Sequence, residues 1–184
     1  MKKFLIALIA VVVIVGGFCF STYNGLVAAN ENVTAQWSQV ENQLQRRNDL
    51  IPNLVNTVKG YASHEEKVFA DVSNARSKLA GASTVRETAA ANGELSNALS
   101  RLLAISEAYP QLKANTNFIQ LQDELAGTEN RLAVARRDYN TAAQQFNTKI
   151  KTFPTNVVAG MMGFSARDYF KADESAKKVP QVKF

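Results

Sequence analysis

Few residues of this 184-residue chain have the types and spacing that catalysis or metal binding requires. There is one histidine, His64, and one cysteine, Cys19, which excludes zinc fingers, iron–sulfur clusters and intramolecular disulfides. A di-iron helical bundle needs two Glu-x-x-His pairs, but Tyr61 stands three residues before the only histidine. The phosphate-binding motifs G-x-x-x-x-G-K-[ST] and G-x-G-x-x-G are also absent. We therefore expect no catalytic residue, no metal and no cofactor, and we classify the chain as a non-enzyme.

We expect the remaining titratable residues to lie on solvent-exposed helix faces. Asp123, Glu124 and Glu129 are separated by steps of one and five, which do not place a close carboxylate pair on one face of a helix. His64 stands at an expected helix start, where capping or solvation is the ordinary role. Lys and Arg number 21 against 16 Asp and Glu, a net charge of +5, of which Lys2 and Lys3 supply two. This excess is small and scattered, so we expect no nucleic-acid partner.

The stretch from Arg46 to Asn53 is the most informative candidate site. Arg47 falls on an otherwise apolar helix face, and a buried guanidinium is costly unless it is paired. Asp49, Asn53 or a carboxylate of the expected helix 117–152 would supply a partner. Two interpretations stay open: a polar brace around a kink at Pro52, or a recognition surface for a partner protein. The candidate residues are Arg46, Arg47, Asp49, Pro52 and Asn53.

The elements that position these residues are helices. Apolar residues recur in steps of four and three, the pattern of one helix face, which predicts helices over 26–62, 64–80, 85–107 and 117–152. Pro52 predicts a kink or break near residues 48–52. Thr84 and Glu87 form a capping-box motif. The predicted fold is all-α, an antiparallel four-helix bundle of long, coiled-coil-like helices, because each apolar face must be buried.

The N-terminal segment Phe4–Phe20 contains no charged side chain and is long enough to begin crossing a bilayer. Three interpretations compete: an uncleaved transmembrane anchor, a cleaved signal peptide with Val27–Ala29 before the cleavage site, or a lipoprotein that uses Cys19. The anchor is favoured, because the cleavage motif lies late and Phe18 occupies a position that needs a small residue. Lys2 and Lys3 then place the N-terminus in the cytoplasm and the bundle outside.

We predict three parts: an anchor over 1–23, a helical bundle over 24–154 and a membrane-proximal tail over 155–184. Apolar residues followed by lysines are typical of an interfacial membrane segment. The alternative is that the tail aromatics cover the open end of the bundle core. The candidate membrane-proximal contacts are Met161, Met162, Phe164 and Phe170, and the lysines are Lys171, Lys177, Lys178 and Lys183.

The chain resembles the LemA family over about 23–170. The resemblance is carried by Trp37–Glu41, by Arg46–Val55 (RRNDLIPNLV), by Val58–Tyr61 and by Leu112–Asn115. Asn48 departs from the small residue more usual at its position. The resemblance implies a bacterial protein anchored near its N-terminus and built as a helical bundle. A relative takes part in magnetosome membrane formation, which suggests a role in membrane organisation.

These observations predict a non-enzymatic envelope protein, single-pass in the bacterial inner membrane, that acts as an interaction or scaffolding module. The expected partners are the lipid bilayer, further copies of the chain as a homo-oligomer, and another membrane protein. The alternative function is an accessory subunit that presents partners or substrates to a membrane protease or transporter. A hydrolase with an unrecognised site is a more distant third.

Overall fold

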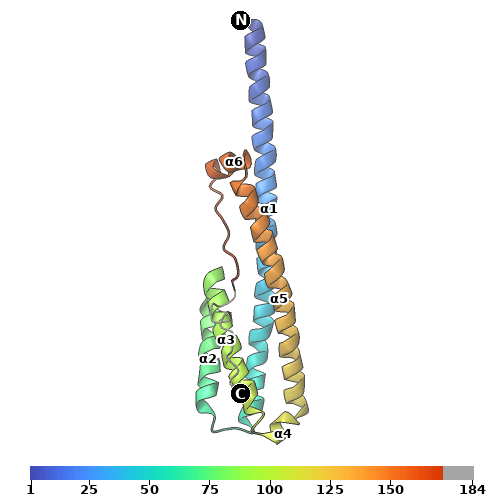
Figure 1. Cartoon of the computed structure of the whole chain (residues 1–184), viewed down its shortest axis with the longest axis vertical. Coiled ribbons are helices and arrows are strands. Elements are labelled where there is room, and N and C mark those ends of the chain that lie inside the picture. The colour runs from blue at the N-terminus through green and yellow to red at the C-terminus, as the bar shows by residue number, and fades with distance from the viewer. Residues whose placement is uncertain (172–184) are drawn as a thin grey trace, which may run out of the picture. The chain divides into compact units, whose positions relative to one another are not determined.

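The computed structural model describes residues 1–171 and is all-helical, with no strand in that range (Figure 1). This confirms the predicted all-α class and its long apolar N-terminal helix. The helices are α1 (Lys2–Lys59), α2 (Glu66–Gly81), α3 (Val85–Ile105), α4 (Pro110–Lys113), α5 (Thr116–Lys151) and α6 (Thr155–Met161).

Helix α1 is one uninterrupted helix that contains both the apolar N-terminal run and Pro52. The chain therefore does not break near residues 48–52. A proline inside a helix costs about 3 kcal/mol through its missing amide donor and its clash with the preceding turn. The buried side chains of Ile51, Leu54 and Val58 surround Pro52 in sequence, and each contributes about 1.5–3 kcal/mol. Their burial offsets the cost of the proline, so the helix continues to Lys59.

The other long helices lie within a few residues of their predicted positions. At the start of α3 the Thr84 hydroxyl accepts from the Glu87 amide at 3.1 Å, and the Glu87 carboxylate accepts from the Thr84 amide at 3.1 Å. The predicted capping box is therefore present. The sequence did not predict α4 or α6, which are single-turn or two-turn helices that begin at or just after Pro110 and Pro154.

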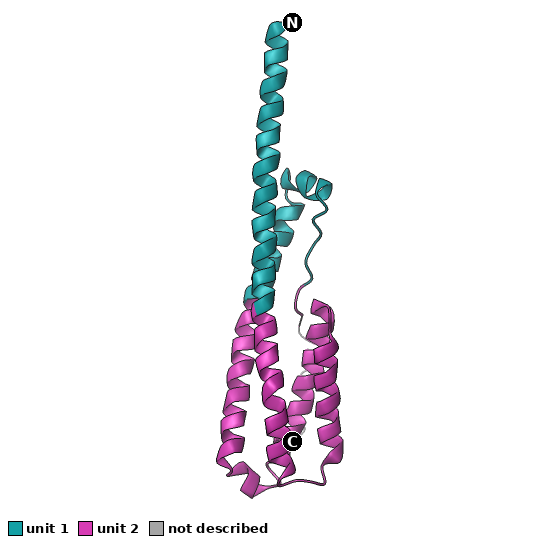
Figure 2. Ribbon diagram, turned by 180° about the vertical axis from the view of Figure 1, so that it is seen from behind, with its two compact units in different colours: residues 1–38, 138–168 teal, residues 39–137, 169–184 magenta. Residues whose placement is uncertain are grey.

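The chain divides into two compact units (Figure 2). Unit 1 comprises residues 1–38 and 138–168, and therefore holds the N-terminal part of α1, the last turns of α5, and α6. Within this unit Trp37 of α1 packs on Tyr139 of α5, with ring centroids 5.1 Å apart. Trp37 is half-buried, so it is less enclosed than its place on the apolar stripe predicts.

Unit 2 comprises residues 39–137 together with the described residues 169–171 of the tail. Its core draws on α1, α2, α3 and α5, and α2 lies against α3. Most buried positions are those of the predicted 3/4 stripes, with Arg47 as the buried charge among them, but Val68, Leu103 and Leu121 are only half-buried and Phe69 is buried beside Val68. The buried positions include Val40, Leu44, Ile51, Leu54, Val58, Val72, Leu79, Leu95, Leu99, Leu102, Phe118, Leu125 and Leu132.

Candidate functional site

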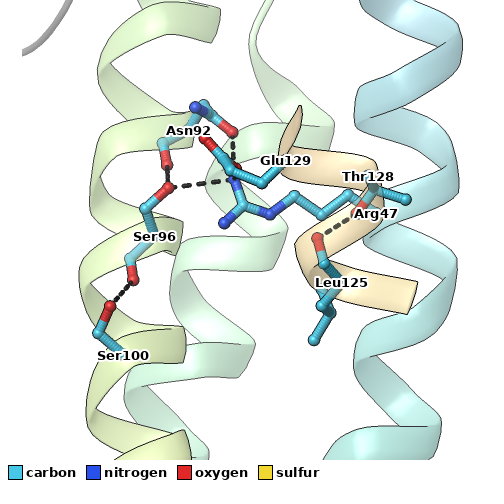
Figure 3. A network of polar contacts seen from close by, with 7 residues as sticks. All are labelled: Arg47, Asn92, Ser96, Ser100, Leu125, Thr128 and Glu129. Atoms are coloured by element: carbon cyan, nitrogen blue, oxygen red, sulfur yellow. Dashed lines mark hydrogen bonds and ion pairs between the residues drawn. The ribbon is translucent and has the colours of Figure 1, made fainter. Parts of the chain in front are cut away.

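Arg47 enters the core of unit 2 from α1 and is 6% exposed (Figure 3). Its Nη1 donates to the Asn92 Oδ1 atom at 2.8 Å and to the Ser96 Oγ atom at 3.1 Å, both on α3. Asn92 is itself buried, and Ser96 donates onward to the Asn92 carbonyl at 2.9 Å. The guanidinium is therefore held by two neutral acceptors that stand one turn apart on one helix.

The charge of Arg47 is balanced by Glu129 of α5, whose Oε2 atom lies 2.8 Å from Nη1 (Figure 3). Both hydrogens of Nη1 are directed to Asn92 and Ser96, so Glu129 acts through charge rather than through an aligned hydrogen bond. Burial lowers the pKa of Arg47 from its usual value, the Glu129 carboxylate raises it, and Arg136 lowers it. Of the partners that the sequence suggested, the carboxylate on the helix over 117–152 is the one present.

This network links three helices around an arginine, which is unsuited to proton transfer. Arginine has no acceptor atom and keeps its proton in proteins. The Arg47 Nε and Asn48 Oδ1 atoms are buried without a hydrogen-bond partner. A cluster of polar groups inside an apolar core restricts which residues can pack opposite one another, because any other alignment would leave more of these groups without hydrogen bonds. The arrangement supports a structural brace at Arg47 more directly than a binding contact.

The other members of the predicted stretch lie outside this network. Arg46, Asp49 and Asn53 are exposed, and Pro52 is half-buried. Arg46 pairs with Glu124 at 3.1 Å, and Asp49 accepts from Gln45 at 2.8 Å. The stretch therefore combines one inward residue with an outward face, so that the two interpretations apply to different residues. That these five residues form a partner surface stays a prediction.

Asn53 lines a surface groove of about 520 Å³ between α1 and α5 within unit 2. Its walls carry four amides, one hydroxyl, one leucine and one carboxylate. The lining residues are Asn53, Asn56, Thr57, Asn117, Gln120, Leu121 and Glu124. Amide side chains both donate and accept hydrogen bonds, so this groove offers donors and acceptors to a bound segment beside an apolar surface of at least equal extent.

Sequence reasoning missed Asn92 and Ser96. Asn92 falls between Ala89 and Leu95 on the buried face of α3. A lone amide on an apolar stripe signals a partner across the core, and Arg47 is the matching irregularity on α1. The two could therefore have been paired from their positions.

The predicted tail contacts fall into exposed and enclosed residues. Met161 is 78% exposed and Met162 is 53% exposed, while Phe170 is 3% exposed and lies under the Arg136 guanidinium at 4.6 Å. Phe164 is half-buried, with its ring 6.1 Å from Tyr23 and 6.2 Å from Phe146. Phe170 is thus occupied inside the protein. Lys171 is exposed, and the lysines at 177, 178 and 183 lie outside the described residues.

The segment that follows α6 is held by polar contacts within unit 1 that the sequence did not reveal. The Arg167 guanidinium donates twice to Asn30 Oδ1, at 3.0 and 2.8 Å. The Asn147 side chain bonds both the amide and the carbonyl of Arg167 at 2.8 Å. The Tyr139 hydroxyl donates to the Asp168 carbonyl at 2.7 Å, and burial raises the pKa of that phenol.

The part of the chain that the structure describes contains no group of three or more His, Cys, Asp or Glu residues able to hold a metal ion. One helix in that range, α1, is long and apolar enough to cross a membrane. Its most apolar stretch has a mean hydropathy of 2.8 and no buried residue.

Comparison with known proteins identifies the family of this chain and several relatives. Residues 36–184 match the LemA family. Magnetosome protein MamQ 2 of Paramagnetospirillum magneticum is 29% identical over 175 residues, covering 81% of this chain and 64% of that protein. MamQ of Magnetospirillum gryphiswaldense is 27% identical, covering 80% and 64%. Protein LemA of Metamycoplasma hominis is 26% identical over 152 residues, covering 82% and 69%.

The chain thus spans less than two thirds of the length of the magnetosome proteins that it matches. The family match itself extends over most of the chain and includes the Arg46–Asn53 stretch, the Arg47 network and the tail contacts. It agrees with the resemblance drawn from the RRNDLIPNLV segment. The chain is a member of the LemA family.

Proposed function

We propose that this protein is a non-enzymatic, single-pass membrane protein whose helical body serves as an interaction or scaffolding module. The observation that carries the proposal is the continuity of α1. An apolar run with no buried residue continues, without a break, as the helix that supplies core residues farther along the chain. A helix of this kind ties a folded body directly to a bilayer.

The proposed orientation places the N-terminus in the cytoplasm of a bacterial cell, with the body on the outer side of the inner membrane. Lys2 and Lys3 precede the apolar run, and the first charge after it is Glu31. Alkaline phosphatase fused after Phe184 should be active in cells, because it requires export to fold. An inactive fusion in a stably produced protein would contradict this orientation and indicate the reverse one.

The proposed architecture of the body is an antiparallel four-helix bundle of coiled-coil type, built from α1, α2, α3 and α5. Each contributes a stripe of buried apolar residues, and the Arg47 network links three of the four. The 3/4 spacing of the stripes supports this packing. Such a body presents side chains on fixed helix faces, which suits recognition of a partner.

The proposed recognition surface is the amide-lined groove between α1 and α5, together with the exposed Arg46, Asp49 and Asn53 beside it. Its occupant would be a polar segment of a second protein, either another copy of this chain or a different membrane protein. The relatives named as magnetosome proteins fit a role in organising a membrane, which a tethered interaction module can perform.

Photo-crosslinking in cells tests this surface. A photoreactive amino acid would replace Asn53 or Gln120 in the groove, and exposed Ser73 on α2 as the matched control. We expect crosslinks from the groove positions to a discrete species and none from Ser73. A crosslink to the chain itself supports a homo-oligomeric scaffold, whereas one to a membrane protease or transporter supports the accessory-subunit alternative. Absence of crosslinks at both groove positions would refute the proposed surface.

A further inference from the structure

The chain that connects the end of α5 to α6 carries an unusual group of exposed apolar side chains. We call residues 149–162 the α5–α6 corner. Phe153 is 78% exposed, Val157 53%, Met161 78% and Met162 53%, whereas Val158 and Ala159 of the same short helix are buried. Helix α6 therefore packs one face against the protein and leaves an apolar face uncovered.

The level of this corner along α1 follows from contacts inside unit 1. Trp37 of α1 packs on Tyr139 of α5, and the two helices run in opposite directions there (Figure 1). The same number of residues separates Trp37 from Tyr23 as separates Tyr139 from Phe153. Because helices rise equally per residue, Phe153 lies close to the level of Tyr23.

Phe164 supports the same placement independently. It follows α6, and its ring contacts Tyr23 directly, at 6.1 Å between centroids. Tyr23 stands three residues beyond Phe20, the end of the apolar run, which is about 4.5 Å along a helix. The corner is thus level with the end of the apolar run, the point at which a membrane-spanning α1 would leave the hydrocarbon core.

The polar contacts after α6 hold the corner at this level. Arg167 is bonded to Asn30 through its side chain and to Asn147 through its backbone. Both contacts lie within unit 1, and they fix the returning segment to α1 and to α5. The exposed apolar face of α6 is therefore presented at a defined height rather than on a freely moving tail.

Charge indicates which partner covers the exposed face. No acidic residue stands between Asp138 and Asp168, and that interval carries Lys149, Lys151 and Arg167. Lys149 and Lys151 are exposed in the last turn of α5, at the start of the corner. Flexible methionines with an aromatic ring, flanked by lysines and free of carboxylates, match an anionic lipid surface.

We propose that the α5–α6 corner inserts Phe153, Val157, Met161 and Met162 into the interface of the bilayer that α1 spans, with Lys149 and Lys151 at anionic headgroups. The proposal rests on the membrane anchoring by α1. The corner gives the protein a second membrane contact beside its anchor, and this contact restricts how the chain can tilt or rotate on the membrane surface. It also makes the attachment sensitive to lipid charge.

Fluorescence depth measurements on the full-length protein in lipid vesicles test the proposal. In a Cys19→Ser background, single cysteines at Met161 or Phe153 would carry an environment-sensitive dye. Ser73→Cys is the water-exposed control, and Val12→Cys reports insertion of α1. Vesicles of phosphatidylcholine, with and without phosphatidylglycerol, would contain a lipid with a nitroxide quencher at a shallow acyl position for residues 153 and 161, or at a deep acyl position for residue 12. Unchanged far-UV circular dichroism would show that each variant is folded.

We expect blue-shifted emission and quenching at positions 161 and 153 in anionic vesicles, and neither at position 73. Lys149→Gln with Lys151→Gln should lower the quenching, since each lysine contributes about fivefold to binding at an anionic surface. Unquenched dye at positions 161 and 153, with quenching at position 12, would refute the membrane contact of the corner and leave the anchoring by α1 supported. Blue-shifted emission without lipid quenching would overturn the contact in favour of a protein partner. Unquenched dye at 12 would refute the anchor itself.

Discussion

The Arg47–Glu129 pair should contribute several times more to stability than the Arg46–Glu124 pair, although both join α1 to α5. The Arg47 side chain is 7% exposed, whereas the side chains of Arg46 and Glu124 are 57% and 51% exposed. Glu129→Gln and Glu124→Gln each remove one carboxylate charge with little change of shape. They differ in whether the arginine left behind is in solvent.

The magnitude follows from this difference. Removing one partner of a fully buried pair costs about 3–5 kcal/mol, because an uncompensated charge stays in the core. Glu129 is itself 42% exposed, so water screens part of its effect, and we expect about 2 kcal/mol. An exposed pair contributes about 0.2–1 kcal/mol, so Glu124→Gln should cost about 0.5 kcal/mol.

Urea unfolding of the detergent-solubilised full chain, followed by far-UV circular dichroism, measures both costs. With a slope of about 2 kcal/mol/M, Glu129→Gln should lower the midpoint by about 1 M. Adding Arg47→Met to Glu129→Gln should recover stability, because it removes the buried charge. Salt at about 1 M should abolish the effect of Glu124→Gln and leave most of that of Glu129→Gln. Equal losses for the two single variants would refute the reasoning.

Four further outcomes follow from local contacts. Thr84→Ala should cost about 1 kcal/mol, measured by urea unfolding, because it removes the cap of α3. Hydrogen bonds from Ser83 and Thr84 lower the pKa of Glu87, so the contribution of this carboxylate to folding stability is lost as pH falls through its folded-state pKa. Glu87→Gln should remove this acid dependence of Tm. Burial raises the pKa of Tyr139, so the contribution of this phenol to folding stability is complete below its unfolded-state pKa and is lost as pH rises through its folded-state pKa. Tyr139→Phe should remove this loss of stability at alkaline pH. Trp37→Ala should cost about 2 kcal/mol, below the 3–5 kcal/mol of a fully buried site, and wild-type emission should be blue-shifted.

The long helices could be predicted because their signals are local. A 3/4 alternation marks the buried face of α5 directly, and the capping box marks the start of α3 with two residues. Pro52 shows where a local signal fails. The proline argues for a break, but burial of Ile51 and Leu54 is a tertiary effect that the local rule omits.

The partner of Arg47 could be predicted only as a class. Its place on a buried face required an acceptor, and a carboxylate on α5 was one of the options. To choose Glu129 over Asp49, one must know how α1 and α5 are aligned along their axes. The apolar stripes define this alignment only to within about one helical turn. Asn92 was the missing signal, since a polar group on each of two facing stripes specifies their register more sharply than apolar residues do.

The tail shows how two readings of one segment can apply to different residues. Sequence offered an interfacial anchor made by the methionines and the aromatics, or a cover for the core made by the aromatics alone. In the structure Phe164 and Phe170 contact protein rings or a guanidinium, while Met161 and Met162 face outward. The separation depends on Arg167, whose bonds to Asn30 and Asn147 turn the segment so that one face packs. Arg167→Ala removes the bonds to Asn30, and Asn147→Ala removes those to the backbone of residue 167. The two substitutions together should therefore release Phe164 from Tyr23 before they affect unit 2, because none of these contacts belongs to that unit.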